Sequence, residues 1–385
     1  MATYPDAAAG LLPYRVLVGA GALGAFGTLV AGVAAERWVV VADAAVAAAH
    51  AGVVLRALAE ARRGAEPLLL TVHPGEVSKT REQWAALTDR MLAAGCGRDT
   101  AVLALGGGVV GDLAGFVAAT YMRGVPVVQA PTTLLAMVDA SVGGKVAVDT
   151  PAGKNLVGAF HPPALVVIDP TTLTTLPPAD LRSGAVEALK HGVIASPAHF
   201  ADAAAFLAHT ADAGVTAADV DSLATLIAAS VEIKARIVAD DPRERGRRHV
   251  LNFGHTVGHA VELLSGYGLR HGDAVAIGMV VEAAAAERAG IASAGTAARI
   301  ADALAAGGLP TAPPPAMRTD AILDAARLDK KARRGTLEYA VPTDIGAMAD
   351  GGGRWTVPLP DPLVREAIEA CRAPSPTPAR AGALA

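Results

Sequence analysis

The sequence predicts an α/β N-terminal domain with a mostly parallel sheet, followed by a mainly α-helical C-terminal domain. Over the first 170 residues, short apolar runs alternate with small, Ala-rich helical stretches, which is typical of buried parallel strands joined by helices. From about Pro177 onward, long Ala, Leu, Val and Ile stretches at helical spacing replace the strands. We therefore expect one domain over residues 1–175, a second over 176–372, and a disordered Pro- and Ala-rich tail over 373–385.

The individual elements follow from runs of apolar residues and their boundaries. The expected strands are short, apolar and bounded by Gly, Pro or Asp, and they are Val16–Val18, Trp38–Val41, Pro67–Val72, Ala101–Leu105, Pro126–Gln129 and Leu165–Ile168. The expected helices of the second half are Pro178–Ile194, Ala217–Ala239, His255–Leu264 and Asp273–Ala289. The Pro-rich run Leu309–Met317 is expected to be a connector.

Length and composition limit the class of protein. The 385 residues are 52% hydrophobic and 18% charged, with a formal net charge of -4. The apolar fraction excludes global disorder, and the slightly acidic balance argues against a nucleic-acid binder, which normally has a basic excess. The two cysteines, Cys96 and Cys371, lie in no metal-like cluster. This cysteine usage favours a reducing cytoplasm over a secreted disulfide scaffold.

One uncharged stretch, Val16–Ala35, meets the length criterion for a membrane span. It is rich in Gly and Ala, however, so its transfer energy into a membrane is weak. A signal peptide needs a basic start, whereas Asp6 precedes Arg15 and no basic residue comes earlier. We expect a strand, a turn and a buried helix here, and no membrane partner.

Two glycine-rich turns compete as phosphate-binding loops. Gly19–Gly24 reads G-x-G-x-x-G after a short strand, with Asp43 about twenty residues on, which matches the dinucleotide fingerprint. Gly106–Asp112 follows the strand expected at Ala101–Leu105 and precedes a helical run. Glycines let backbone N–H groups approach a pyrophosphate, and a helix N-terminus favours the anion. In a chain with 41 glycines, the pattern alone does not decide which of the two turns binds phosphate.

A cluster of charged side chains lies in an apolar, Gly-rich region. Asp139–Lys145 places an acid and a base around a glycine pair, and Lys154 with Asn155 follows nine residues on. Lysines beside glycine turns suit phosphate capture. The alternative is a solvated loop with incidental lysines, but charge is scarce in this chain. The clustering therefore favours an anion site.

Histidines and a glutamate in the helical half indicate a metal site. His255 and His259 are spaced to share one helix face, as in zinc-binding helices. Glu187 with two of His255, His259 and His271 could form a His2Glu site with one open position. The spacing leaves open which two histidines bind. Glu187 also shares a helix face with Lys190, and that pair could instead be a surface ion pair of small worth.

Seven segments together resemble 3-dehydroquinate synthase, a sugar-phosphate cyclase. They occur in the family's order and spacing within a match from about Pro13 to about Pro342, and they are Gly106–Asp112, Tyr121–Gly124, Pro131–Leu135, Asp139–Lys145, Gly153–Leu156, Glu187–Lys190 and Leu251–His259. The resemblance implies an NAD-dependent, divalent-metal lyase of the shikimate pathway, which supplies aromatic amino acid biosynthesis. Its substrate would be 3-deoxy-D-arabino-heptulosonate 7-phosphate, and its products 3-dehydroquinate and phosphate. Zinc or cobalt, a cytoplasmic location and a homodimer are expected.

The resemblance also implies roles for individual residues. The metal ligands would be Glu187, His255 and His271. The Gly107-Gly108 turn would bind the NAD phosphates, and Gly19–Gly24 would become a packing turn. The other cofactor positions are Asp43, Glu76, Lys79, Asp112, Thr132, Thr133, Lys145 and Lys154. The catalytic and substrate positions are Arg123, Asp139, Lys145, Lys154, Asn155, Lys190, Lys234, Arg248, Asn252, His259 and Lys330. Among them, Arg123 would reach the partner subunit's site, and His259 would be a proton relay.

Four positions depart from the pattern of the family. Ala45 stands where the family often has Asn near the adenosine ribose, which would remove one polar contact of about 1 kcal/mol. Val146, Asp149 and His191 stand where Thr, Asn and Tyr are common. None of these changes removes a catalytic group, but they leave room for a relative that acts on a modified substrate.

Other functions compete with the leading one. A related cyclase of secondary metabolism could be an aminodehydroquinate synthase or a 2-epi-5-epi-valiolone synthase. The retained His259, Lys234 and Arg248 argue against the valiolone type, whereas the amino variant stays open. A metal-dependent alcohol dehydrogenase would share the two-domain plan, but the lysine-rich anion pocket disfavours it. A degenerate binding protein is disfavoured by the complete set of metal ligands.

Overall fold

The computed structural model describes residues 4–61, 66–210, 214–328 and 337–372. Two predictions lie outside the described residues, namely the disordered tail over 373–385 and the substrate role of Lys330. The division at residues 175/176 stays a prediction. It falls between a 3-10 helix, η5 (Pro170–Thr175), and the long helix α6 (Pro178–Ala195).

The first half of the chain builds a parallel sheet. Within the described residues, six strands pair in the order β1-β8-β5-β4-β2-β3, and every pairing is parallel. The strands are β1 (Arg15–Val18), β2 (Arg37–Asp43), β3 (Leu68–Val72), β4 (Thr100–Gly106), β5 (Val127–Pro131) and β8 (Leu165–Ile168). All six predicted strands are confirmed, with bounds that differ by no more than two residues.

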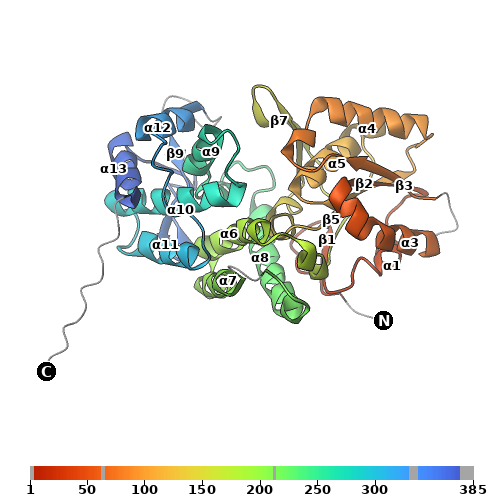
Figure 1. Cartoon of the computed structure of the whole chain (residues 1–385), viewed down its shortest axis with the longest axis horizontal. Helices are drawn as coiled ribbons and strands as arrows, with labels where there is room; N and C mark the ends of the chain where they lie inside the picture. Colours follow the sequence, from red (N-terminus) through yellow and green to blue (C-terminus); the bar gives the residue numbers. More distant parts are fainter. Residues whose placement is uncertain (1–3, 62–65, 211–213, 329–336, 373–385) are drawn as a thin grey trace.

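Helices cover both faces of this sheet, as Figure 1 shows. Val39 and Val41 of β2 face a core with α4 (Arg81–Ala93) and α5 (Gly108–Thr120). Val40 faces the opposite core, which contains α1 (Phe26–Leu29) and α3 (Gly52–Ala61). The strands are therefore buried on both sides, which explains why they read as continuous apolar runs.

The uncharged stretch Val16–Ala35 forms most of β1, a turn and the short helix α1, as predicted, although only Phe26 and Gly27 of this helix are buried. A different helical stretch, Ala44–Ala61, is long and apolar enough to cross a membrane by length and composition alone, and 17% of it is buried. It consists of α2 (Ala44–Val46), a π-helical turn η1 (Ala47–Ala51) and α3. Core helices of soluble proteins pass the same test, so this stretch is weak evidence for a membrane location.

The second half is mainly helical, and the four predicted helices are confirmed. They correspond to α6, α8 (Val220–Asp240), α9 (His255–Leu264) and α10 (His271–Arg288). The structure adds α7 (Pro197–Thr210), α11 (Thr296–Ala306), α12 (Thr319–Leu328) and α13 (Asp361–Arg372). The run Leu309–Met317 connects α11 to α12, as expected.

The expectation that strands stop near Pro177 is wrong in detail. Two short antiparallel pairs lie beside the helices: β9 (Glu338–Tyr339) with β12 (Val357–Pro358), and β10 (Pro342–Asp344) with β11 (Ala347–Met348). Strands of two or three residues are too short to show a periodicity, so the sequence pattern could not indicate them.

A β-hairpin was not among the predicted elements. The antiparallel strands β6 (Lys145–Thr150) and β7 (Gly153–Phe160) carry the lysine-rich segment that the sequence indicated as an anion site. In Figure 1 the hairpin lies beside the gap between the sheet and the helical half. The lysines therefore come from paired strands rather than from a loop.

Helices α9 and α10 cross at glycines. A Cβ atom at Gly278 would lie 1.9 Å from the carbonyl oxygen of Gly254 and 2.7 Å from the amide nitrogen of Gly258. Backbone atoms cannot move aside as a flexible side chain can. The close approach of these helices therefore depends on the missing side chain, and it sets the position of the histidines that α9 and α10 carry.

Gly278→Ala is expected to lower the free energy of unfolding by about 3 kcal/mol, because the added methyl group overpacks a backbone contact. Gly32→Ala is the matched control, since a Cβ there meets no atom within 4 Å, and it should change stability by less than about 0.5 kcal/mol. Urea denaturation measures both. Equal stability of the two variants would contradict the glycine contact.

Candidate active site

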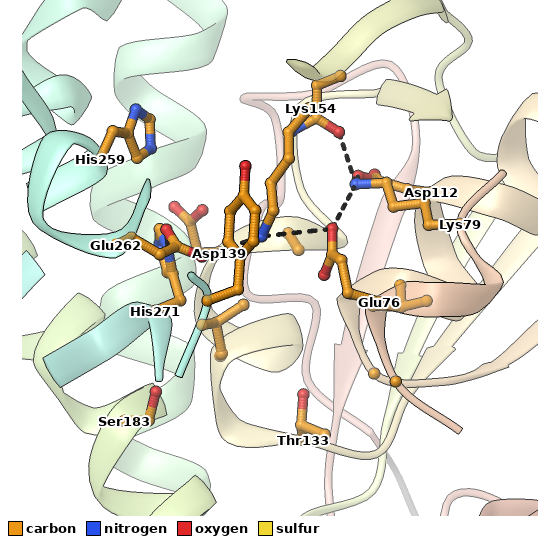
Figure 2. A pocket seen from close by; sticks show the side chains of 18 of the residues that line it. Glu76, Lys79, Asp112, Thr133, Asp139, Lys154, Ser183, His259, Glu262 and His271 are labelled. Atoms are coloured by element: carbon orange, nitrogen blue, oxygen red, sulfur yellow. Dashed lines mark hydrogen bonds and ion pairs between the residues drawn. The ribbon is translucent and has the colours of Figure 1, made fainter. Parts of the chain in front are cut away.

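A cavity of about 1670 Å³ lies between the carboxyl ends of the parallel strands and the helical half. Side chains from both halves line it, and Figure 2 shows them converging. Of the predicted site residues, those that line the cavity are Asp43, Glu76, Lys79, Gly107, Gly108, Asp112, Thr132, Thr133, Asp139, Lys145, Lys154, Asn155, Asn252, His259 and His271. One cavity therefore joins the residues predicted for cofactor, metal and substrate.

The cavity opens where the order of the sheet reverses. From β2 the chain continues to β3 on one side, whereas from β4 it continues to β5 on the other. Ligands of open α/β sheets bind at such a switch point, beyond the carboxyl ends of the strands. Gly107 precedes α5 as its N-cap and Gly108 is the first residue of that helix, so this turn presents a helix N-terminus to the cavity.

The second glycine turn, Gly19–Gly24, does not line the cavity. The amides of Gly21 and Leu23 donate to the two carboxylate oxygens of Asp169, each at 3.0 Å. These donors are already used within the protein, so the turn packs β1 against the end of β8. Of the two candidates that the sequence left open, only Gly107-Gly108 faces the cavity.

Lys79 organises the wall next to this turn. Its ammonium group donates to Asp112 Oδ2 and to Asn155 Oδ1, each at 2.6 Å. Burial lowers the pKa of Lys79, but Asp112 and Glu76 outweigh burial and raise it. At the end of β2, Asp43 Oδ1 accepts from the amides of Ala45 and Val46. These contacts fix polar groups along the side of the cavity where β2 and β4 end.

A second wall carries lysines from the β6–β7 hairpin. Lys145 forms an ion pair with Glu244, whose other oxygen accepts from Asn252 at 2.8 Å. Lys154 reaches across the cavity to Glu262 Oε1 at 2.9 Å and lies 4.3 Å from the ring centroid of Tyr267. Both lysines therefore contact groups of the helical half, and a substrate anion bound there would lie between the two halves.

A charge network extends from Asp139 at the cavity wall into the protein interior. Asp139 Oδ1 lies 2.9 Å from the ammonium of Lys234 and 3.6 Å from Nε2 of His191. Burial raises the pKa of Asp139, but Lys234 and Lys190 outweigh burial and hold it well below its usual range. Burial lowers the pKa of Lys234 to about 8 despite Asp139. Asp139 is therefore an ionised group whose position is fixed by buried cations.

Arg248 is also buried, and it supports the backbone rather than lining the cavity. Its guanidinium donates to the carbonyl oxygens of Pro242 and Gly143. A Cβ at Gly143 would lie 2.3 Å from Arg248 Nη2, and Gly143 has a φ of +104°. Gly143, the first glycine of the pair in Asp139–Lys145, thus makes room for this arginine.

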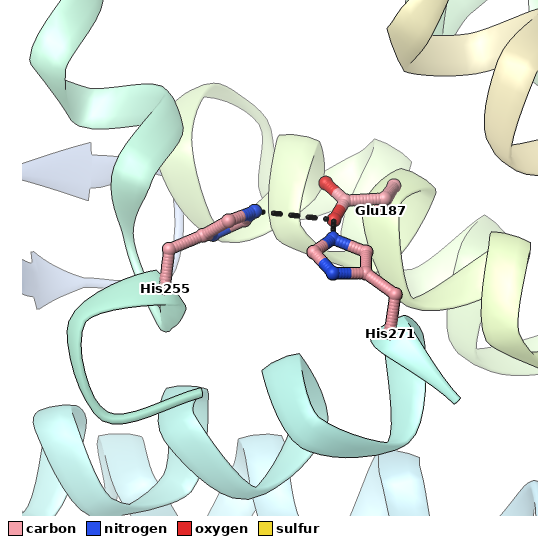
Figure 3. Close-up of side chains that lie close together, drawn as sticks. All are labelled: Glu187, His255 and His271. Carbon is pink, nitrogen blue, oxygen red and sulfur yellow. Dashed lines mark ion pairs between the residues drawn. The ribbon is translucent and has the colours of Figure 1, made fainter. Parts of the chain in front are cut away.

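Three side chains at the cavity's helical wall could hold a metal. Figure 3 shows both histidines facing Glu187. Nε2 of His255 and Nε2 of His271 each lie 3.5 Å from Glu187 Oε1. Two ligand atoms of a tetrahedral zinc ion, each about 2.1 Å from it, are about 3.4 Å apart. Glu187 Oε1 is buried and accepts no hydrogen bond from the described residues. The spacing and this free oxygen fit a divalent metal.

The charges around Glu187 and His255 also fit a metal. Burial raises the pKa of Glu187, but Lys190, His255 and His271 together outweigh burial and lower it, so the carboxylate is ionised. Burial and Lys190 hold the pKa of His255 well below its usual value, which leaves a neutral ring. Nδ1 of His255 lies 3.0 Å from the carbonyl of Phe253. If Nδ1 donates there, the lone pair of Nε2 is available to a metal.

The pair Glu187 and Lys190 is not the surface ion pair that the sequence left possible. Both side chains are 1% exposed, and the ammonium contacts Oε2 of Glu187. The remaining oxygen, Oε1, is the one that faces the two histidines. Lys190 therefore fixes the orientation of the carboxylate.

A second group, His259, Glu262 and His271, also lies within ligand distance. Its carboxylate is already engaged at both oxygens, since Oε1 of Glu262 accepts from Lys154 and Oε2 lies 3.2 Å from Nδ1 of His271. The first group has a free carboxylate oxygen, so it fits a metal better.

The N-terminus of α9 is anchored by a buried carboxylate from α10. Glu282 accepts from the amide of Gly254 at 2.7 Å and from the amide of Val257 at 2.9 Å. Negative charge at a helix N-terminus is stabilising. This contact holds the helix whose first residue is His255.

The structure does not bring every predicted residue to the cavity. Arg123 is exposed in a 3-10 turn, η3 (Tyr121–Arg123), and does not line it. Glu187, Lys190, Lys234, Arg248 and His255 lie behind its wall. Two lining residues, Glu244 and Glu262, were not predicted as site residues. Glu244 lies in a charged run that reads as a solvated loop, and the only available signal for Glu262 was its place on the helix of His255 and His259.

Taken together, this geometry defines a class of enzyme that uses a dinucleotide and a metal on an anionic small molecule. Residues 69–183 match the family model for the N-terminal part of 3-dehydroquinate synthase, and residues 184–332 match that for the C-terminal part. A 3-dehydroquinate synthase from Synechococcus sp. (strain CC9605) is 44% identical over 363 residues, which cover 93% of this chain and 94% of the relative. The chain belongs to the 3-dehydroquinate synthase family.

Two solved structures are similar throughout. A 2-deoxy-scyllo-inosose synthase complexed with carbaglucose-6-phosphate, NAD+ and Co2+ has a TM-score of 0.81 and 26% identity, covering 93% of this chain and 96% of that chain. The 2-epi-5-epi-valiolone synthase of Streptomyces hygroscopicus subsp. jinggangensis 5008, with NAD+ and Zn2+ bound, has a TM-score of 0.80 and 26% identity. It covers 97% of this chain and 99% of that chain. The fold is therefore that of sugar-phosphate cyclases.

Proposed function

We propose that this protein is a 3-dehydroquinate synthase, which converts 3-deoxy-D-arabino-heptulosonate 7-phosphate to 3-dehydroquinate and phosphate. The observation that carries this proposal is that a dinucleotide turn, two lysines and His271, one member of a His2Glu group, line one cavity. The 44% identity to a 3-dehydroquinate synthase over 93% of the chain supports the same substrate.

NAD would bind along the wall beside Gly107-Gly108, with its phosphates at the N-terminus of α5. The other residues of this wall are Asp43, Glu76, Lys79, Asp112, Thr132 and Thr133. Zinc or cobalt would be held by Glu187, His255 and His271. When bound, the two groups supply hydride acceptance and polarisation of a substrate hydroxyl.

The chain's own residues bind and orient a doubly anionic substrate. Lys145, Lys154 and Asn155 present cationic and amide groups to its phosphate and carboxylate. Local positive charge attracts the substrate although the net charge of the chain is negative.

The reaction also needs a group that moves a proton while the phosphate leaves. His259 lines the cavity beside His271, with ring centroids 6.0 Å apart. We assign it the transfer of a proton to or from the leaving phosphate. A histidine suits this role because its ordinary pKa lies near neutral pH.

The proposal includes a cytoplasmic homodimer with no nucleic-acid or membrane partner. Arg123 is exposed and does not line the cavity of its own chain. Its guanidinium is therefore free to reach the partner subunit's site, as the family resemblance implies. The two cysteines are free thiols, which suits a reducing compartment.

A comparison of substrates tests the anion pocket of this proposal. The heptulosonate 7-phosphate is expected to react at least about 100-fold faster than a sugar 7-phosphate that lacks the carboxylate. Without the carboxylate, the groups of the site that bind it are left without a partner. Initial rates of phosphate release measure the ratio. The 4-amino analogue is the third substrate, and a faster rate with it would assign the chain to the amino variant instead.

A further inference from the structure

We propose that Glu262 is a positioning residue that orients the metal ligand His271 through its outer ring nitrogen. The inference rests on the proposed function, since it assigns a role toward the same metal. It concerns a residue that neither the sequence pattern nor the family resemblance singled out for this site.

The first observation is the direction of the two nitrogens of His271. Nε2 lies 3.5 Å from Glu187 Oε1, on the side of the metal group, and Nδ1 lies 3.2 Å from Glu262 Oε2. A histidine that binds a metal through one nitrogen donates its other N–H to a carboxylate, a carbonyl or water. Glu262 is placed as that acceptor, because it contacts the nitrogen that faces away from Glu187.

The second observation is that Glu262 cannot turn freely. Its side chain is 8% exposed, and Oε1 accepts from Lys154 at 2.9 Å while Oε2 faces His271. The carboxylate is therefore held at both oxygens. A fixed acceptor fixes the plane of the imidazole ring and the tautomer with Nε2 free.

The third observation is that the two histidine ligands differ in what their Nδ1 atoms contact. His255 has a backbone acceptor, the carbonyl of Phe253 at 3.0 Å from its Nδ1, whereas Nδ1 of His271 faces the side chain of Glu262 at 3.2 Å. His271 is also the first residue of α10, where backbone restraint is weakest. Orientation of this ligand therefore depends on a side chain from α9.

The experiment measures Co2+ affinity by competition with a chelator and records the visible absorption of the Co2+-loaded full chain. Glu262→Ala is expected to bind Co2+ about 10- to 100-fold more weakly, with the absorption spectrum of the wild type, because the three ligands are unchanged. Glu262→Gln is expected to lose less, since its amide oxygen still accepts from Nδ1. Glu232→Ala, which removes an exposed carboxylate of α8, is the matched control and should match the wild type.

Two results would overturn the positioning role. One is a Glu262→Ala affinity within twofold of the wild type. The other is an altered Co2+ spectrum in Glu262→Gln, which would make Glu262 a ligand. Should Glu262→Ala fail to fold in urea denaturation, Glu262→Gln carries the test. A separate variant tests the metal assignment itself. If that assignment is wrong, His271→Ala will retain Co2+, whatever the affinity of the Glu262 variants.

Discussion

The His271→Ala variant is expected to lose its metal on purification and to lose its cyclase activity with it. The change leaves two of the three groups that converge on one point, Glu187 and His255. Loss of an outer-sphere partner costs about 10- to 100-fold in metal affinity, so loss of a ligand should cost more than about 100-fold. Metal content after gel filtration, measured by atomic emission, checks this.

The matched control for this prediction is His209→Ala. His209 lies on α7, its side chain is 69% exposed, and it pairs with Asp219 at the surface. Such a pair contributes little to stability, so this variant should keep full metal content and activity. Full metal content in His271→Ala would contradict the ligand assignment.

The Lys145→Ala variant is expected to bind substrate about 10- to 150-fold more weakly, which corresponds to about 1.5–3 kcal/mol for a hydrogen bond to a charged group. Lys145 lies on the hairpin, and its ammonium contacts Glu244 of the helical half. Glu244 also accepts from Asn252, which places Lys145 on the substrate side of the cavity. Binding of NAD should therefore be unchanged.

Substrate affinity and NAD affinity, measured separately by calorimetry, decide between the two positions that the resemblance implies for Lys145. Arg245→Ala is the matched control, because it removes an exposed cation next to Glu244 that does not line the cavity. An unchanged substrate constant in Lys145→Ala would remove the anion-pocket role. An equal loss of NAD affinity would assign the lysine to the cofactor.

The parallel sheet could be predicted because its strands are buried on both faces. Val39, Val40 and Val41 alternate between two cores, so the whole run is apolar and stands out in the sequence. The hairpin could not be predicted in this way. Its strand β7 is largely exposed and contains Lys154 and Asn155, so no apolar alternation separates it from a polar loop.

The site could be predicted only in part from the residue pattern. Spacing on one helix made His255 and His259 equivalent, since both face the same side. The distinction comes from α6 and α10, which bring Glu187 and His271 to His255. The burial of Lys190 beside Glu187 is likewise a tertiary property. A helical i, i+3 pair reads the same at the surface and in the core.

The central claim is that NAD is a catalyst in a phosphate-eliminating cyclisation. The measurement that tests it most directly is phosphate release by the purified full chain with 3-deoxy-D-arabino-heptulosonate 7-phosphate, NAD and zinc, while NADH absorbance is followed in parallel. We expect one phosphate for each 3-dehydroquinate formed and no net NADH. Accumulation of NADH in step with substrate consumption would contradict the claim and indicate a dehydrogenase, and no phosphate release from the folded, metal-loaded protein would contradict the substrate assignment.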